Sequence, residues 1–124
     1  MSKKKKHQKP LNRQKWNKRI KIYHNKGSEH FLLVVALRGN YVAGHDLTTH
    51  PSLNKNGCPK KKYLKLYKNP NPSDSRNSYL DKHLRINIKI FFDDTGRKRL
   101  TAKRKWKISK KDKKIIKRID RNKL

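Results

Sequence analysis

FLLVVAL, residues 31–37, is a run of seven apolar residues in a chain in which 36% of the residues are charged. Short apolar runs rich in β-branched and aromatic residues, bounded by polar and turn-forming residues, are typical of strands buried on both faces. The triplet RGN at 38–40 predicts a turn, after which YVAGHDL at 41–47 resumes an extended pattern and runs into the polar segment 48–52. We therefore expect a hairpin in the middle of the core, whose second strand delivers a polar loop.

Shorter segments around this hairpin alternate apolar and polar residues, which indicates strands with one face in the core. They are 19–23 (RIKIY), 63–67 (YLKLY), 84–92 (LRINIKIFF) and 97–102, the last expected to return beside 84–92 after a turn at 93–96 (DDTG). Ser109 and Asp112 fit a capping box at the start of a closing helix over 109–122, whose isoleucines share one face. The sequence therefore predicts one mainly β domain over 19–124, a small barrel or strongly bent sheet with a C-terminal helix.

The charge of the chain is extreme, because 37 Lys and Arg against 8 Asp and Glu give a formal net charge of +29 over 124 residues. Such self-repulsion disfavours a compact monomer and indicates a polyanionic partner. Nucleic acid is the first candidate, since lysines and arginines that neutralise phosphates release condensed counterions. Residues 1–18, with a lysine run at 3–6, are expected to form a disordered basic arm that orders on phosphates; a solvated tail is the alternative.

Three further features bear on the cellular setting. Cys58 is the single cysteine and cannot form an internal disulfide, which favours a reducing compartment. The N-terminal lysines are not followed by the apolar stretch of a secretory signal. No segment approaches the roughly 18 apolar residues of a membrane span, and the basic stretches lack the interleaved Trp, Phe and Leu of an interfacial helix. We therefore expect a cytoplasmic protein with no membrane partner.

The densest group of reactive side chains lies at the end of the central hairpin. The group consists of His45, Asp46, Thr48, Thr49, His50 and Ser52. In an RNA-cleaving site, a hydroxyl or imidazole contacts the scissile phosphate, a base removes the ribose 2′ proton, and a cation stabilises the phosphorane. The alternative is an ordinary polar loop in which Thr and Asp side chains cap backbone groups.

Two other groupings give weaker signals. His45, His50 and Cys58 have no fourth ligand at a recognised zinc spacing, so neither a metal nor another cofactor is expected. Tyr63 and Tyr67 lie amid lysines and are candidates for base stacking, as in proteins that bind single strands. The alternative for both tyrosines is packing over the edge of the barrel.

The order of these segments resembles that of the PemK/MazF growth-inhibitor toxins and the related ToxN type. The resemblance is carried by the strand at 19–23, the Gly-Ser-Glu triplet at 27–29, the buried strand from Phe31, the Thr pair at 48–49, and WKIS at 106–109 leading into the helix. That family usually places an Arg and a Pro between the Gly-Ser-Glu loop and the buried strand, whereas here His30 leads directly into Phe31. The catalytic arginine of the family therefore has no direct counterpart, which leaves Arg19, Arg38 or His30 as substitutes.

The resemblance implies an SH3-like β-barrel, often dimeric, that cleaves single-stranded RNA without a metal. It also implies an antitoxin partner, which is either an acidic protein or an RNA. By position, Thr48 or Thr49 matches the hydroxyl near the scissile phosphate. Gly27, Ser28 and Glu29 match the loop that faces the substrate.

Two functions follow, both of which begin with binding of RNA, with DNA as the alternative ligand. The first is a metal-independent endoribonuclease with Thr48 or Thr49 at the phosphate and His30 or His50 as acid or base. The second is a non-catalytic nucleic-acid-binding module of the same fold, docked on ribosomal or structured RNA, which the charge and the missing arginine favour. The further residues expected to contact nucleic acid are Arg38, Lys60, Lys61, Lys62, Tyr63, Tyr67, Arg97, Arg99 and Arg104.

Overall fold

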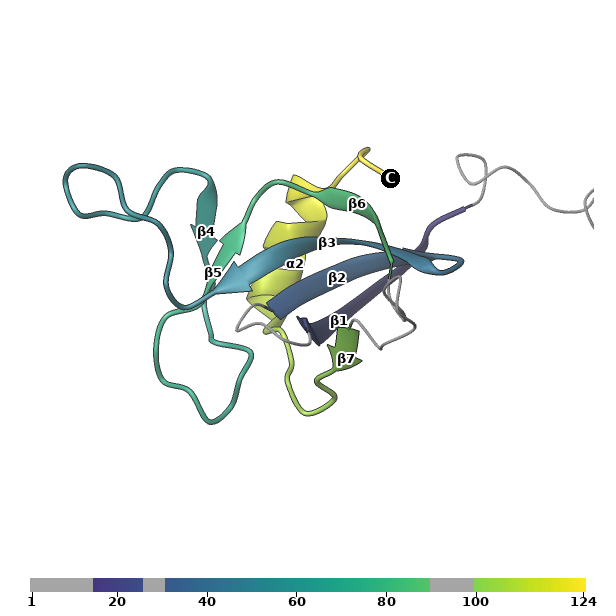
Figure 1. Ribbon diagram of the computed structural model, residues 1–124, viewed down its shortest axis with the longest axis horizontal. Coiled ribbons are helices and arrows are strands. Elements are labelled where there is room, and N and C mark those ends of the chain that lie inside the picture. Colours follow the sequence, from purple (N-terminus) through teal and green to yellow (C-terminus); the bar gives the residue numbers. More distant parts are fainter. Residues whose placement is uncertain (1–14, 26–30, 90–99) are drawn as a thin grey trace, which may run out of the picture.

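The computed structural model describes residues 15–25, 31–89 and 100–124, which form one antiparallel sheet and one helix (Figure 1). In chain order, the elements are β1 (Asn17–Asn25), β2 (Phe31–Arg38), β3 (Tyr41–Thr48), β4 (Tyr63–Lys65), β5 (Tyr79–Asp81), β6 (Arg85–Lys89), β7 (Leu100–Ala102) and α2 (Lys110–Ile119). The strand order is β4-β5-β3-β2-β1-β7, and β6 also pairs with β3. The prediction of a mainly β domain with one C-terminal helix is therefore confirmed.

The hairpin of β2 and β3 lies in the middle of the sheet, and β2 is buried on both faces as the apolar run predicts. Leu33 and Val35 belong to the hydrophobic cluster on the helix side, whereas Leu32 and Val34 belong to a second cluster. A two-residue loop joins the strands, and its Gly39 has a φ of +60°. Positive φ at the first central position is what a type II′ hairpin turn requires, and glycine adopts it without strain.

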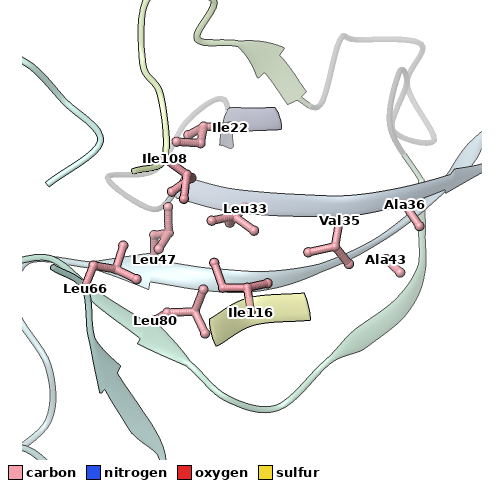
Figure 2. Packing of buried hydrophobic residues seen from close by; sticks show 10 residues of the cluster. All are labelled: Ile22, Leu33, Val35, Ala36, Ala43, Leu47, Leu66, Leu80, Ile108 and Ile116. Carbon is pink, nitrogen blue, oxygen red and sulfur yellow. The ribbon is translucent and has the colours of Figure 1, made fainter. Parts of the chain in front are cut away.

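Helix α2 lies against one face of the sheet, where the buried Ile116 packs among side chains of β2, β3 and β5 (Figure 2). Ser109 caps the helix, and its Oγ accepts a hydrogen bond from the Asp112 N–H at 3.1 Å, as the capping box predicts. The helix ends at Ile119, with Asp120 as its C-cap, and is thus shorter than the predicted range of 109–122.

The pairing of the last strands differs from the prediction. Strand β6 pairs with β3 and β7 pairs with β1, so the described parts of 84–92 and 97–102 are not partners in a hairpin. The two-residue alternation in β6 is also interrupted, because Asn87 has a φ of +57°. Ile88 therefore packs against the second cluster, while Ile86 is 53% exposed. The predicted turn at 93–96 lies outside the described residues.

Strand β4 ends at Lys65, before the predicted boundary at 67, because the following backbone turns toward the helix. The Tyr67 N–H donates to Asp112 Oδ1 at 2.8 Å, and the Lys68 N–H donates to Asp112 Oδ2 at 3.3 Å. Asp112 is fully buried, and its Oδ2 also accepts from Ser109 Oγ at 2.9 Å. One buried carboxylate thus ties the start of the helix to the segment that follows β4.

The predictions of a basic N-terminal arm and of no membrane span can be compared with the described residues only. Residues 1–14 of the predicted arm lie outside the described residues, and β1 begins at Asn17, before the expected strand at 19–23. Within the three described ranges, no helix has the length and apolar composition needed to cross a membrane.

Candidate functional site

A cavity of about 760 Å³ opens beside the end of β3. The polar segment after β3 contributes Thr48, Thr49 and His50 to its lining. The loop between β4 and β5 contributes Asp74 and Arg76, and aromatic side chains complete the wall. The cavity therefore gathers hydroxyl, imidazole, carboxylate and guanidinium groups from segments that are distant in the sequence.

The polar segment after β3 is arranged around His50. Thr48 Oγ1 accepts a hydrogen bond from the His50 N–H at 2.9 Å, which is the backbone capping that the sequence leaves as an alternative. Thr49 Oγ1 lies 3.1 Å from His50 Nδ1 and orients the imidazole. Within the described part of the chain, His50 Nε2 has no hydrogen-bond partner and is available to a substrate.

Arg76 supplies a cation to the cavity. Its Nε donates to Asp74 Oδ1 at 3.0 Å, and its Nη2 donates to Asp74 Oδ2 at 2.7 Å. This fork lowers the pKa of Asp74 from its ordinary value of 3.8 to about 2, and the nearby His50 adds a small effect in the same direction. Nη1 of Arg76 has no partner among the described residues, and the Arg76 side chain is 60% exposed. The guanidinium is thus oriented by Asp74 and still has N–H groups for a phosphate.

The Asp74 carboxyl is expected to titrate near pH 2, and Arg76→Gln is expected to return its pKa toward 3.8. Because the folded-state pKa lies below the unfolded value, the pairing stabilises the fold above about pH 4 and is lost as the pH falls toward 2. NMR titration of the side-chain carboxyl carbon measures this directly. The matched control is Arg85→Gln, which removes the arginine paired with Asp46 and should leave the Asp74 pKa unchanged. An Asp74 pKa that does not respond to Arg76→Gln contradicts the fork.

Aromatic rings also line the cavity. His24 of β1 pairs with Phe31 of β2, and their ring centroids are 5.0 Å apart. The Phe31 ring lies 4.5 Å from that of Trp106, and Lys103 Nζ is 5.7 Å from the Trp106 centroid. The three ring-bearing residues are half-buried, and aromatic rings beside a lysine are the type of surface on which single-stranded bases stack.

The sequence-predicted residues are only partly brought together. Thr48, Thr49 and His50 line the cavity. The predicted residues Gly27, Ser28, Glu29, His30, Arg97 and Arg99 lie outside the described residues. His24 and Phe31, which flank the segment 26–30 in the sequence, line the cavity.

Arg38 lies far from this cavity. It is 8% exposed, its guanidinium carbon is 4.2 Å from the centroid of the Trp16 ring, and its Nη2 donates to Asn87 Oδ1 at 2.8 Å. Along β2 it is seven residues from Phe31, or about 24 Å at a rise of about 3.4 Å per residue. We therefore leave Arg38 out of the candidate site. The arginine that lines the cavity is Arg76, which was not among the sequence candidates Arg19, Arg38 and His30.

The remaining predicted contacts lie outside the cavity lining. These are Lys60, Lys61, Lys62, Tyr63, Tyr67 and Arg104. Lys60 and Lys61 are exposed, whereas Lys62 Nζ lies 3.6 Å from Asp81 Oδ2 and 5.1 Å from the centroid of the Tyr63 ring. The Tyr63 hydroxyl lies 3.2 Å from Ser52 Oγ, a hydrogen bond that lowers the pKa of Tyr63.

His45 belongs to the reactive group by sequence but not to the cavity. It is fully buried, with Nδ1 2.8 Å from the Asp81 carbonyl oxygen and Nε2 2.9 Å from the Asp120 carboxylate. His45 therefore fastens the end of the helix to the sheet. Within the described ranges, no cluster of three or more His, Cys, Asp or Glu residues could hold a metal ion.

Sequence reasoning missed Arg76, Asp74, His24 and Trp106. Their local patterns carry no signal, because each comes to the cavity through contacts between distant segments. No protein-family model, curated protein or solved structure matches this chain. The function is therefore inferred from the residues of the cavity.

Proposed function

We propose that this chain binds single-stranded RNA in the cavity beside β3 and cleaves it without a metal ion. The observation that carries the proposal is the meeting of His50, Arg76 and the aromatic wall in one cavity of a chain with a net charge of +29. The rings offer stacking surfaces to bases, and the guanidinium offers a planar phosphate ligand. The imidazole provides the acid or base that phosphodiester chemistry needs.

The residues can be assigned to the steps of a transesterification. His50, oriented by Thr49, removes the ribose 2′ proton, and the 2′ oxygen attacks the phosphorus. Arg76 stabilises the charge that develops on the phosphorane oxygens. The bond to the 5′ oxygen breaks, and His24 gives that oxygen a proton. The products are a 2′,3′-cyclic phosphate and a 5′ hydroxyl, so atoms and charge balance without a further reactant.

The distribution of charge supports an anionic ligand. Among the Lys and Arg side chains in the described ranges, only Lys62, Arg76 and Arg85 lie within 4.0 Å of a described carboxylate. Apart from the buried Arg38, the other cations of this part of the chain have no described carboxylate within that distance and can contact phosphates. Binding should therefore weaken steeply as the salt concentration rises.

The proposal extends to the family that the sequence resembles. Arg76 fills the role of the arginine that the PemK/MazF pattern lacks here, although it comes from a different part of the chain. An SH3-like barrel, a homodimer and a protein or RNA antitoxin are parts of the same proposal. Action on cellular RNA would also place the protein in the cytoplasm, in keeping with its single cysteine.

Incubation with total RNA in EDTA tests the proposal. We expect discrete fragments with 5′ hydroxyl ends, and their loss in the Thr48→Ala/Thr49→Ala double variant, because His50 then loses the Thr49 hydroxyl beside its Nδ1 and the Thr48 cap on its backbone N–H. RNA binding by the variant should persist. The matched control is Thr101→Ala, an exposed threonine of β7, which should cleave like the unaltered protein. Intact RNA after incubation with the unaltered protein would contradict the nuclease proposal.

A non-catalytic RNA-binding module is the second candidate. The observation that favours it is that Asp74 already occupies one edge of the Arg76 guanidinium, while the Thr48 hydroxyl caps a backbone N–H. The same incubation separates the two candidates, because RNA that stays intact and co-purifies with the protein supports the module.

A further inference from the structure

Tyr67 stands out on the surface just beyond the cavity. It is 69% exposed, whereas Leu53 and Ile86, the other exposed large apolar side chains among the described residues, are 54% and 53% exposed. Lys111 Nζ lies 4.3 Å from the centroid of the Tyr67 ring, which is within cation–π range. With a lysine on one face and most of the residue exposed, the ring offers its other face to a ligand.

The position of Tyr67 is fixed by the core. Its backbone N–H donates to Asp112 Oδ1 at 2.8 Å, and Asp112, in the first turn of α2, is fully buried. The preceding residue, Leu66, is buried in the hydrophobic cluster on the helix side of the sheet. The backbone of Tyr67 is therefore held beside the helix before any ligand arrives, which reduces the entropy cost of binding.

The exposed face of α2 beside Tyr67 is cationic throughout. Lys111, Lys114 and Arg118 fall at positions i, i+3 and i+7, so they lie on one side of the helix, and all three are exposed. The two carboxylates of residues 107–124 point inward, because Asp112 is buried and the side chain of Asp120, paired with His45, is 9% exposed. No described acid therefore neutralises Lys111, Lys114 and Arg118, and charge complementarity favours the phosphate backbone of a nucleic acid.

Tyr67 lies two residues before the lining of the cavity in the chain. Asn69 and Pro70, which line the cavity, follow Tyr67 closely in the chain. The Lys107 N–H donates to the Pro70 carbonyl oxygen at 3.3 Å, immediately after the cavity residue Trp106. An RNA strand bound in the cavity can therefore extend past Pro70 toward the Tyr67 ring and Lys111.

We propose that Tyr67, backed by Lys111, stacks a nucleotide of single-stranded RNA outside the cavity, and that Lys111, Lys114 and Arg118 bind the phosphates that follow. The inference rests on the proposed RNA ligand and adds a second subsite for the same strand. A single strand fits better than a duplex, since a stacking ring engages an unpaired base and the cavity receives one strand.

Binding of labelled oligoribonucleotides of two lengths tests the subsite. On the site sizes usual for single-strand binders, we expect oligomers of about 4 nucleotides to occupy the cavity alone and oligomers of about 12 to extend to the helix. Tyr67→Ala should weaken binding of the longer oligomer about tenfold and leave the shorter one unchanged, as one lost stacking contact predicts. Tyr67→Phe should retain the affinity, because the phenyl ring stacks as well. Leu53→Ala is the matched control for truncation of an exposed apolar side chain.

The outcomes separate this inference from the proposed function. Equal affinity of Tyr67→Ala and the unaltered protein for the longer oligomer overturns the subsite, even if cleavage is observed. Equal weakening for both lengths also overturns it, since the ring then acts on the cavity. If Tyr67→Ala loses affinity for the longer oligomer only and the unaltered protein does not cleave RNA, the subsite is supported and only the nuclease proposal is contradicted. Failure of the unaltered protein to bind either oligomer overturns both proposals.

Discussion

RNA cleavage by the His50→Gln variant is expected to be at least about 100-fold slower than by the unaltered protein, because a positioned acid or base contributes roughly 10² to 10⁴ in rate. Glutamine keeps the hydrogen-bonding character and much of the size of histidine but cannot take up the ribose 2′ proton. Thr48 still caps the backbone at this position, since that bond uses the N–H of residue 50. Binding of RNA should therefore remain close to that of the unaltered protein. Single-turnover cleavage of a labelled RNA in EDTA gives the rate.

His83→Gln is the matched control, because His83 is exposed and its side chain is absent from the cavity lining. Its cleavage rate should equal that of the unaltered protein. A His50→Gln variant that cleaves at the same rate contradicts the assignment of the base. Loss of cleavage together with equal loss of binding would make His50 a binding residue.

The second large effect concerns stability. His45→Ala is expected to lower the free energy of unfolding by about 2 to 5 kcal/mol, because a buried acceptor left without its partner costs about 1 to 3 kcal/mol and this variant leaves two. The imidazole is fully buried, and the variant leaves both the Asp81 carbonyl and the Asp120 carboxylate without it. A carboxylate at the C-terminus of a helix is also unfavourable toward the helix dipole, so Asp120 depends on His45 for compensation. Urea unfolding followed by circular dichroism measures the change.

Asp120→Asn provides the milder companion variant. The amide can still hydrogen-bond to His45 Nε2, so the expected loss is about 1 kcal/mol, the usual net value of one hydrogen bond. This variant remains measurable if His45→Ala does not fold. His83→Ala, which truncates an exposed histidine, should change stability by less than about 0.5 kcal/mol. A His45→Ala variant as stable as the His83→Ala variant contradicts the role of His45.

Part of the candidate site could be predicted from the sequence. The polar segment with Thr48, Thr49 and His50 follows a strongly apolar strand pattern, and the structure places these three residues in the cavity. The sequence pattern does not indicate that His45, in the same reactive group, is buried against the end of the helix. It also cannot show that the loop carrying Arg76 returns to the end of β3, because that return depends on pairing of β5 with β3.

The sequence by itself determined the features that neighbouring residues control. These are the central hairpin with its glycine turn, a strand buried on both faces, the Ser109 cap of the helix, and the charge that favours a polyanion. Only the tertiary structure decided the partners of β6 and β7, the burial of His45 and the entry of Arg76 into the cavity. The physical reason is range: periodicity and capping act over a few residues, whereas the contact between His45 and Asp120 joins residues 75 positions apart. Such contacts form only when the whole sheet and its helix bury their apolar faces together.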